Sequence, residues 1–255
     1  MTTLTPGIEI ERRFKLLVSA SRLSSESALV SQWYLPGTGS WTARCRMTTP
    51  RSGESSYTYT MKKDTAELNA SLTELEFTVM RQHTHPVGVQ KERYHKHNDE
   101  FLWELDVFRN SELSGLEIAE VELPSLYTPI SIPIWIGTEI TNVRCLSNIS
   151  LSRFLNNPQE QLEAAEAVCA HFSRVFDGHL SDLGKVNITS FFKSTDAFER
   201  SRRFVADLVK QEYGCVSLNQ EEIVWLSTDD SLTLLDLTLY VAFCRRKNKK
   251  NKAKA

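Results

Sequence analysis

Apolar and polar residues alternate along most of the N-terminal half of the chain. In the segment GIEIERRFKL (7–16), the isoleucines and the phenylalanine fall on one side of an extended strand, and Glu9, Glu11 and Arg13 fall on the other. A period of two is typical of β-strands. The sequence predicts eight strands: IEIERRFKLL (8–17), SQWYL (31–35), WTARCRMT (41–48), SSYTYTMKK (55–63), SLTELEFTV (71–79), GVQKERYHKH (88–97), EFLWELDVF (100–108) and LEIAEVEL (116–123).

Turn residues such as PGTGS (36–40) and PRSG (50–53) separate these strands. Eight antiparallel strands at this spacing fit a closed β-barrel, which leaves no sheet edge exposed. Two stretches interrupt the pattern, ASRLSSESALVSQ (20–32) and the segment after Val79, and we expect short helices or loops there.

Helical spacing of apolar residues begins near residue 156. The segment 158–176 predicts one helix, and 194–214 predicts a second. Ser194 or Thr195 suits the N-cap of the second helix, and Gly214 suits its end.

The apolar run 231–243 fits two structures. Its strict alternation favours a strand, paired in a hairpin with 222–227, while a helix stays open because long apolar runs occur in both. The basic tail 247–255 is predicted to be disordered. The predicted class is therefore α+β: an eight-stranded antiparallel barrel with flanking helices over 1–155, then a mainly helical domain over 156–246.

The composition is that of a globular protein, with 41% hydrophobic and 24% charged residues among 255. A net charge of −2 argues against a general nucleic-acid binder. Five scattered cysteines without a CxxC pair indicate a reducing compartment, and we expect a cytoplasmic protein. No secretion signal and no apolar stretch of about 20 residues is present, so no membrane contact is expected.

Charged residues recur two positions apart within the predicted strands, so each pair shares a face. A charged face is usually solvated, but six such strands weaken that interpretation, because solvated faces mix in Ser, Thr and Gln. The pairs are Glu9 and Glu11 with Arg13, Arg44 and Arg46, Glu74 and Glu76, Lys91 and Arg93, Glu104 and Asp106, and Glu120 and Glu122, with Lys62 alone on its strand.

Two ligand chemistries follow from these faces. Eight carboxylates around one space repel each other unless divalent cations lie between them, and hard oxygen ligands select Mg²⁺ or Mn²⁺. Arginine binds phosphate oxygens in a bidentate manner. Together these features indicate a metal-bound polyphosphate.

In this ordered set the chain resembles the CYTH superfamily, the triphosphate tunnel metalloenzymes. Their first strand reads ExExK, and here it reads Glu9-Ile-Glu11-Arg-Arg13. The resemblance covers about residues 7–155, includes the closing region 132–151, and extends in particular to small bacterial inorganic triphosphatases that begin EIERKF. The matching motifs are RCR (44–46), MK (61–62), ELE (74–76), KERY (91–94), ELDVF (104–108) and EVEL (120–123).

The resemblance implies a role for each charged pair inside an eight-stranded tunnel. The implied ligands of a two-metal site are Glu9, Glu11, Glu104, Asp106, Glu120 and Glu122, of which Glu104 and Asp106 serve a second metal or orient water. The implied catalytic residues are Glu74, Glu76, Lys91 and Tyr34. The implied triphosphate clamp is Arg13, Arg44, Arg46, Lys62, Lys91, Arg93 and Arg144.

The chain departs from this pattern at two places. Arg13 replaces the family's lysine, which keeps the charge but changes the geometry at that phosphate. The closing helix reads VRCLSN (143–148) where the family commonly reads DKRYSN, and this change bears on tunnel closure and turnover.

The predicted activity is metal-dependent hydrolysis of a triphosphate, inorganic or organic. One metal would neutralise the leaving diphosphate, and a second, with Glu74 or Glu76, would activate water. Two alternatives stay open: a class IV-type adenylate cyclase, and a non-catalytic triphosphate or nucleotide sensor with the C-terminal region as output. The expected partner is a small triphosphate; 5′-triphosphate RNA is the one nucleic acid kept open, and a homodimer is also left open.

Overall fold

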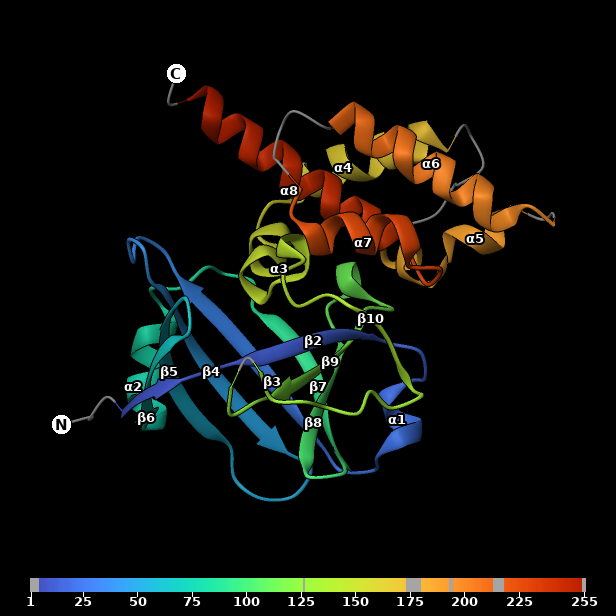
Figure 1. Cartoon of the computed structure of the whole chain (residues 1–255). Coiled ribbons are helices and arrows are strands. Elements are labelled where there is room, and N and C mark those ends of the chain that lie inside the picture. The colour runs from blue at the N-terminus through green and yellow to red at the C-terminus, as the bar shows by residue number, and fades with distance from the viewer. Residues whose placement is uncertain (1–4, 126, 173–179, 193–194, 213–217, 254–255) are drawn as a thin grey trace. The chain divides into compact units, whose positions relative to one another are not determined.

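The computed structural model describes residues 5–125, 127–172, 180–192, 195–212 and 218–253 (Figure 1). The chain divides into two compact units. The sheet unit comprises Met1–Asn110 and Glu117–Ile136, and the helical unit comprises Ser111–Leu116 and Gly137–Ala255. The domain limit expected at residue 155 stays a prediction of the family resemblance.

Ten strands and eight α-helices are formed by the described residues. The strands are β1 (Thr5–Ile8), β2 (Glu11–Leu16), β3 (Ser27–Leu35), β4 (Thr42–Pro50), β5 (Ser56–Lys63), β6 (Ala66–Leu72), β7 (Val89–Asn98), β8 (Phe101–Phe108), β9 (Glu117–Glu122) and β10 (Ile136–Glu139). The α-helices are α1 (Ala20–Leu23), α2 (Glu74–Arg81), α3 (Asn148–Leu155), α4 (Pro158–His171), α5 (Ile188–Phe191), α6 (Ala197–Glu212), α7 (Gln220–Thr228) and α8 (Leu234–Lys252). The 3₁₀ turns are η1 (Ser111–Leu113), η2 (Arg144–Leu146) and η3 (Leu180–Lys185).

The strands form one sheet in the order β1-β6-β5-β4-β3-β7-β8-β9-β2-β10. The α+β class is confirmed, but the predicted closed barrel of eight strands is not what the strand order shows. The first segment of the chain contributes two strands, β1 and β2. Glu9 N donates to Thr65 O at 3.0 Å, whereas Ile10 O accepts from Leu123 N at 2.7 Å, so the segment changes its pairing partner from β6 to β9 between these two residues.

Seven of the eight predicted strands are present, and the prediction for 71–79 is wrong. Residues 74–81 form the helix α2, which packs on β4, β5 and β6 (Figure 1). Thr73 begins this helix with a capping box, in which Glu76 N donates to Thr73 Oγ1 at 3.2 Å and Thr73 N donates to Glu76 at 2.8 Å. The local capping interaction therefore overrides the alternation of Glu and apolar residues.

The apolar core of the sheet unit lies on the face opposite to the charged pairs. Phe14, Trp103 and Val121 are each at most 2% exposed. The rings of Phe14 and Trp103 lie 5.6 Å apart, and Trp135 packs edge-on against Trp103 at 5.4 Å. This core positions β2, β8 and β9, because alternation then directs the intervening charged residues to the other face.

Both helices predicted from periodicity in the C-terminal region are confirmed, as α4 and α6. Of the residues proposed to bound the second one, Ser194 and Gly214 lie outside the described residues, and the helix begins two residues after Thr195.

The strand and hairpin favoured for 222–243 are wrong, because this region forms α7 and α8. Helix α8 packs against α3, α4 and α6, and every residue from Leu234 to Cys244 is buried. A helix that is buried on all sides shows no polar stripe, so its sequence cannot reveal a 3.6-residue period. The tail predicted to be disordered continues this helix to Lys252.

Four of the cysteines, Cys45, Cys145, Cys169 and Cys244, are free thiols, and Cys215 lies outside the described residues. Among the helices of the described ranges, none combines the length and the apolar character needed to cross a bilayer.

Candidate functional site

The charged pairs of the sheet unit come together through the strand register. Arg13 on β2 lies opposite Glu120 on β9, Glu120 lies opposite Glu104 on β8, and Arg93 on β7 lies opposite Asp106 on β8. Residues opposite each other on one sheet face have Cβ atoms about 4.5–5.5 Å apart. Four neighbouring strands therefore bring acidic and basic side chains into direct contact on one face.

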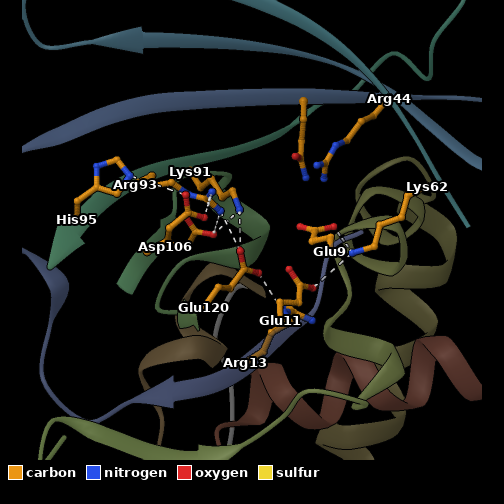
Figure 2. Close-up of polar contacts among 12 residues, drawn as sticks. Glu9, Glu11, Arg13, Arg44, Lys62, Lys91, Arg93, His95, Asp106 and Glu120 are labelled. Carbon is orange, nitrogen blue, oxygen red and sulfur yellow. Dashed lines mark hydrogen bonds and ion pairs between the residues drawn. The ribbon is translucent and has the colours of Figure 1, made fainter. Parts of the chain in front are cut away.

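Arg93 is the centre of the first group of charges (Figure 2). Its Nε donates to Asp106 Oδ1 at 2.7 Å, and its Nη2 donates to Glu120 Oε2 at 2.9 Å, while a further ion pair joins it to Glu104. Lys91 is fully buried and ion-paired with Asp106. Burial, followed by the charge of Arg93, lowers the pKa of Lys91, and the charges of Asp106 and Glu120 oppose this shift.

Glu120 is surrounded by cations. Arg13 Nε lies 3.0 Å from its Oε1, and Lys91 Nζ lies 4.0 Å from its Oε2, the oxygen that also accepts from Arg93. Burial opposes ionisation, but the charges of Lys91, Arg13 and Arg93 outweigh it and hold the pKa of Glu120 far below its usual range. Both oxygens of this implied metal ligand are thus engaged by protein cations.

A second group contains Glu9, Glu11 and Lys62 (Figure 2). Lys62 is ion-paired with Glu9, and its Nζ lies 3.9 Å from Glu11 Oε1. Burial, and then the charge of Glu120, raises the pKa of Glu11 to about 7. Burial lowers the pKa of Lys62, but Glu11 and Glu9 outweigh it and raise the value overall. One ammonium therefore pairs with two carboxylates, so this group contains fewer cations than carboxylates.

A cavity of about 420 Å³ opens beside this second group, and six of its ten lining residues are glutamates. They are Glu9, Glu11, Glu100, Glu104, Glu120 and Glu122. Burial, followed by the charges of Glu9, Glu104 and Glu67, also raises the pKa of Glu122. Crowded carboxylate oxygens are the kind of donor that suits Mg²⁺ or Mn²⁺. Within the described residues, however, no three His, Cys, Asp or Glu side chains are grouped as a metal site.

The two arginines of β4 differ in whether a carboxylate lies close enough to pair with the guanidinium. Arg44 lies 3.7 Å from Glu67 and beside Tyr34, which is buried and contacts Gln32 at 3.3 Å. Arg46 has no hydrogen bond or ion pair to any residue that the structure describes, and its Nε is buried. The charge of Arg44, then burial, then the charge of Arg93 lowers the pKa of Arg46 to about 10. A half-buried cation whose buried nitrogen has no hydrogen-bond partner is costly unless an anion binds to it.

Three of the predicted site residues are not brought into these groups. Glu74 and Glu76 are exposed on α2, where Glu76 serves the capping box. Arg144 belongs to the helical unit, where its Nη2 lies 2.6 Å from Glu222 Oε2 and its Nε donates to Glu222 Oε1 at 2.8 Å. Their implied roles thus gain no support from the geometry.

The sequence prediction missed Glu67, which is ion-paired with Arg44 at 3.7 Å. It is on β6, whose polar residues Glu67, Asn69 and Ser71 alternate with apolar ones. The same alternation used for the other strands would have identified it, had 71–79 not been assigned as the strand in its place.

Neither the family models nor the curated proteins compared with the chain match it. Among solved structures, the inorganic triphosphatase NE1496 is 28% identical, with 57% of this chain and 95% of that chain covered and a TM-score of 0.41. A structure of the same NE1496, described as a hypothetical protein, covers 56% of this chain and 97% of its own at 28% identity, with a TM-score of 0.42.

A putative adenylate cyclase from Bacillus halodurans is 19% identical, with 47% of this chain and 82% of that chain covered and a TM-score of 0.36. Among solved structures, this chain is thus similar over about half of its length to an inorganic triphosphatase and to a putative adenylate cyclase.

Proposed function

We propose that the sheet unit binds the phosphate chain of a triphosphate and hydrolyses it with Mg²⁺ or Mn²⁺. The observation that carries the proposal is Arg46, a guanidinium with a buried Nε and no partner among the described residues, beside the equally charged Arg44. Such a group is stabilised when a polyanion binds, and guanidinium geometry matches phosphate oxygens.

The proposed clamp places cations on several strands around the phosphates. Arg44, Arg46 and Arg93 would bind the phosphate oxygens, while Asp106 and Glu120 hold Lys91 and Arg93 in position. Fixed cations of this kind stabilise the charge that develops during phosphoryl transfer without reorganising.

The glutamates of the cavity are the proposed metal ligands. Glu9, Glu11 and Glu122 suit this role better than Glu120, because the latter is neutralised by three protein cations. A bound divalent metal would neutralise phosphate charge and activate water. Hydrolysis then adds one water across the terminal P–O–P bond and yields orthophosphate and a diphosphate.

The test is phosphate release from tripolyphosphate, thiamine triphosphate, ATP, GTP and 5′-triphosphate RNA, with and without Mg²⁺ or Mn²⁺. Arg46→Ala is expected to lower the rate by about 10²–10³, the effect of removing one transition-state donor. Glu11→Gln is expected to abolish metal-dependent release. Matched controls are Arg22→Ala and Glu54→Gln, since both side chains are exposed and lie outside the site.

Other outcomes separate the alternatives. Full activity in Glu11→Gln would refute the metal assignment, and full activity in Arg46→Ala would refute the clamp. Pyrophosphate with a cyclic nucleotide would indicate a cyclase, and tight binding without turnover would indicate a sensor. Loss of activity in Glu74→Gln would restore the catalytic role that the family resemblance implies. A cytoplasmic location belongs to the same proposal.

A further inference from the structure

The second half of α8 is a dense cationic segment of the helical unit. Six of the eight residues from 245 to 252 are Lys or Arg, and no Asp or Glu occurs after Asp236. This concentration contrasts with the net charge of −2 of the whole chain. Positive charge is therefore gathered locally, although the total is close to balance.

Cations from two elements, η2 and α8, converge on one aromatic ring in this segment. The charged groups of Arg144 on η2, Arg246 and Lys247 lie 5.5, 5.9 and 5.5 Å from the ring centre of Phe243. Arg153 on α3 is close enough to affect the pKa values of both Arg246 and Lys247. The arrangement is a folded cluster and not only a run of basic residues along one helix.

Carboxylates neutralise only part of the cluster. Glu222 holds Arg144 at 2.6 Å, Glu160 holds Arg246 at 2.9 Å, and Glu163 lies 3.3 Å from Lys249. Three exposed cations have no carboxylate partner among the residues that the structure describes: Arg153, Lys247 and Lys250. Burial lowers the pKa of Lys247, and the charges of Arg153 and Lys250 add to this shift.

We propose that Arg153, Lys247 and Lys250, the α3–α8 cationic cluster, bind the phosphate backbone of a single-stranded nucleic acid. Residues three apart on a helix have Cβ atoms about 5–6 Å apart, which suits contact with successive phosphates. The two asparagines of the segment, Asn248 and Asn251, add neutral hydrogen-bonding groups between the cations.

A membrane surface fits the cluster less well. Interfacial helices bury an apolar face, whereas residues 245–253 contain no apolar side chain larger than that of Ala253. Binding by this cluster is independent of triphosphate hydrolysis, because none of its three residues lies in the sheet unit.

The experiment measures fluorescence anisotropy of a 3′-labelled, 5′-hydroxyl U20 RNA with the full chain. Because its 5′ end is a hydroxyl, this RNA offers no triphosphate to the proposed clamp. Three contacts on a single strand predict a slope of log K against log salt of about −2, or roughly 20-fold weaker binding at 200 mM than at 50 mM KCl. The variant Arg153→Ala/Lys247→Ala/Lys250→Ala is expected to bind at least about 10-fold more weakly at 50 mM KCl, with a slope near zero.

The matched control removes three exposed cations from α6 of the same unit: Arg200→Ala/Arg203→Ala/Lys210→Ala. This control loses the same net charge as the α3–α8 variant but keeps the proposed binding residues. It is therefore expected to change affinity by less than about twofold. Circular dichroism checks that both variants fold. An equal loss in both, or an unchanged slope in the α3–α8 variant, would overturn the proposal. So would binding to vesicles with phosphatidylserine but not to RNA, or tighter binding of inorganic polyphosphate than of RNA per phosphate.

Discussion

Buried polar side chains have different roles in the two units. In the helical unit, buried carboxylates complete capping boxes: Asp236 accepts from Thr233 N at 2.9 Å, and Glu222 accepts from Asn219 N at 3.2 Å. In the sheet unit, Asp106 and Lys91 are fully buried, and each neutralises a side chain from another strand. The comparison teaches that satisfied buried polar groups stabilise a fold, whereas the unpaired Arg46 is the residue on which the proposed phosphate clamp depends.

The largest expected effect is on the buried charges of the sheet unit. Asp106→Ala leaves Lys91 and Arg93 without their main carboxylate, and we expect the free energy of unfolding to fall by about 3–5 kcal/mol. Urea unfolding measures this change. Replacement of Lys91 by Met in the same variant should recover part of the loss, because it removes an uncompensated buried cation. A loss below 1 kcal/mol in the single variant would contradict the importance of this group.

The helical unit is expected to respond through packing and not through charge. Leu237 is fully buried in α8, and Leu237→Ala should lower the free energy of unfolding by about 2–5 kcal/mol. The same loss should appear at low and high salt, since no ionic contact is removed. Leu102→Ala is the control, because that side chain is 43% exposed and its loss should be small. If the loss of unfolding free energy in Leu237→Ala depended strongly on salt, the distinction between packing in the helical unit and charge in the sheet unit would be wrong.

A smaller effect is expected at Glu92, which alternates with Lys91 and Arg93 on β7 and so points to the opposite face of the sheet. Its carboxylate accepts a hydrogen bond from Ser27 at 2.7 Å and is ion-paired with Arg109 and Arg51. Burial opposes ionisation, but the hydrogen bonds from Ser27, Arg109, Tyr94 and Arg51 lower the pKa of Glu92 to about 2, from 4.5. A lowered pKa in the folded state means that the stabilisation is complete above pH 4.5 and is lost as the pH falls toward 2.

We therefore expect Glu92→Gln to be about 1 kcal/mol less stable than the parent chain at pH 7, with the difference shrinking between pH 4.5 and 2. Stability curves of both proteins over this range test the prediction. A difference that grows on acidification would show that the sign is wrong. Glu26→Gln is a suitable control, since its side chain is exposed.

The errors of sequence interpretation have a common physical cause. In 71–79 and 231–243, alternation of apolar residues suggested strands, although both segments start with a capping signal: Thr73 with Glu76, and Thr233 with Asp236. These signals are local and could have been recognised. For 231–243 the burial of the helix on all sides removed the competing evidence of a polar stripe.

By itself, the sequence determined seven strands and the face to which the charged pairs on those strands point, because a period of two leaves no freedom in that choice. It also determined which residue types could meet metal and phosphate. Only the tertiary structure decided which charges neutralise one another. Arg93 contacts three carboxylates and Arg46 none among the described residues, since these contacts depend on the register between paired strands. Likewise, Arg144 is held by Glu222, 78 residues away, a partner that no local pattern could indicate.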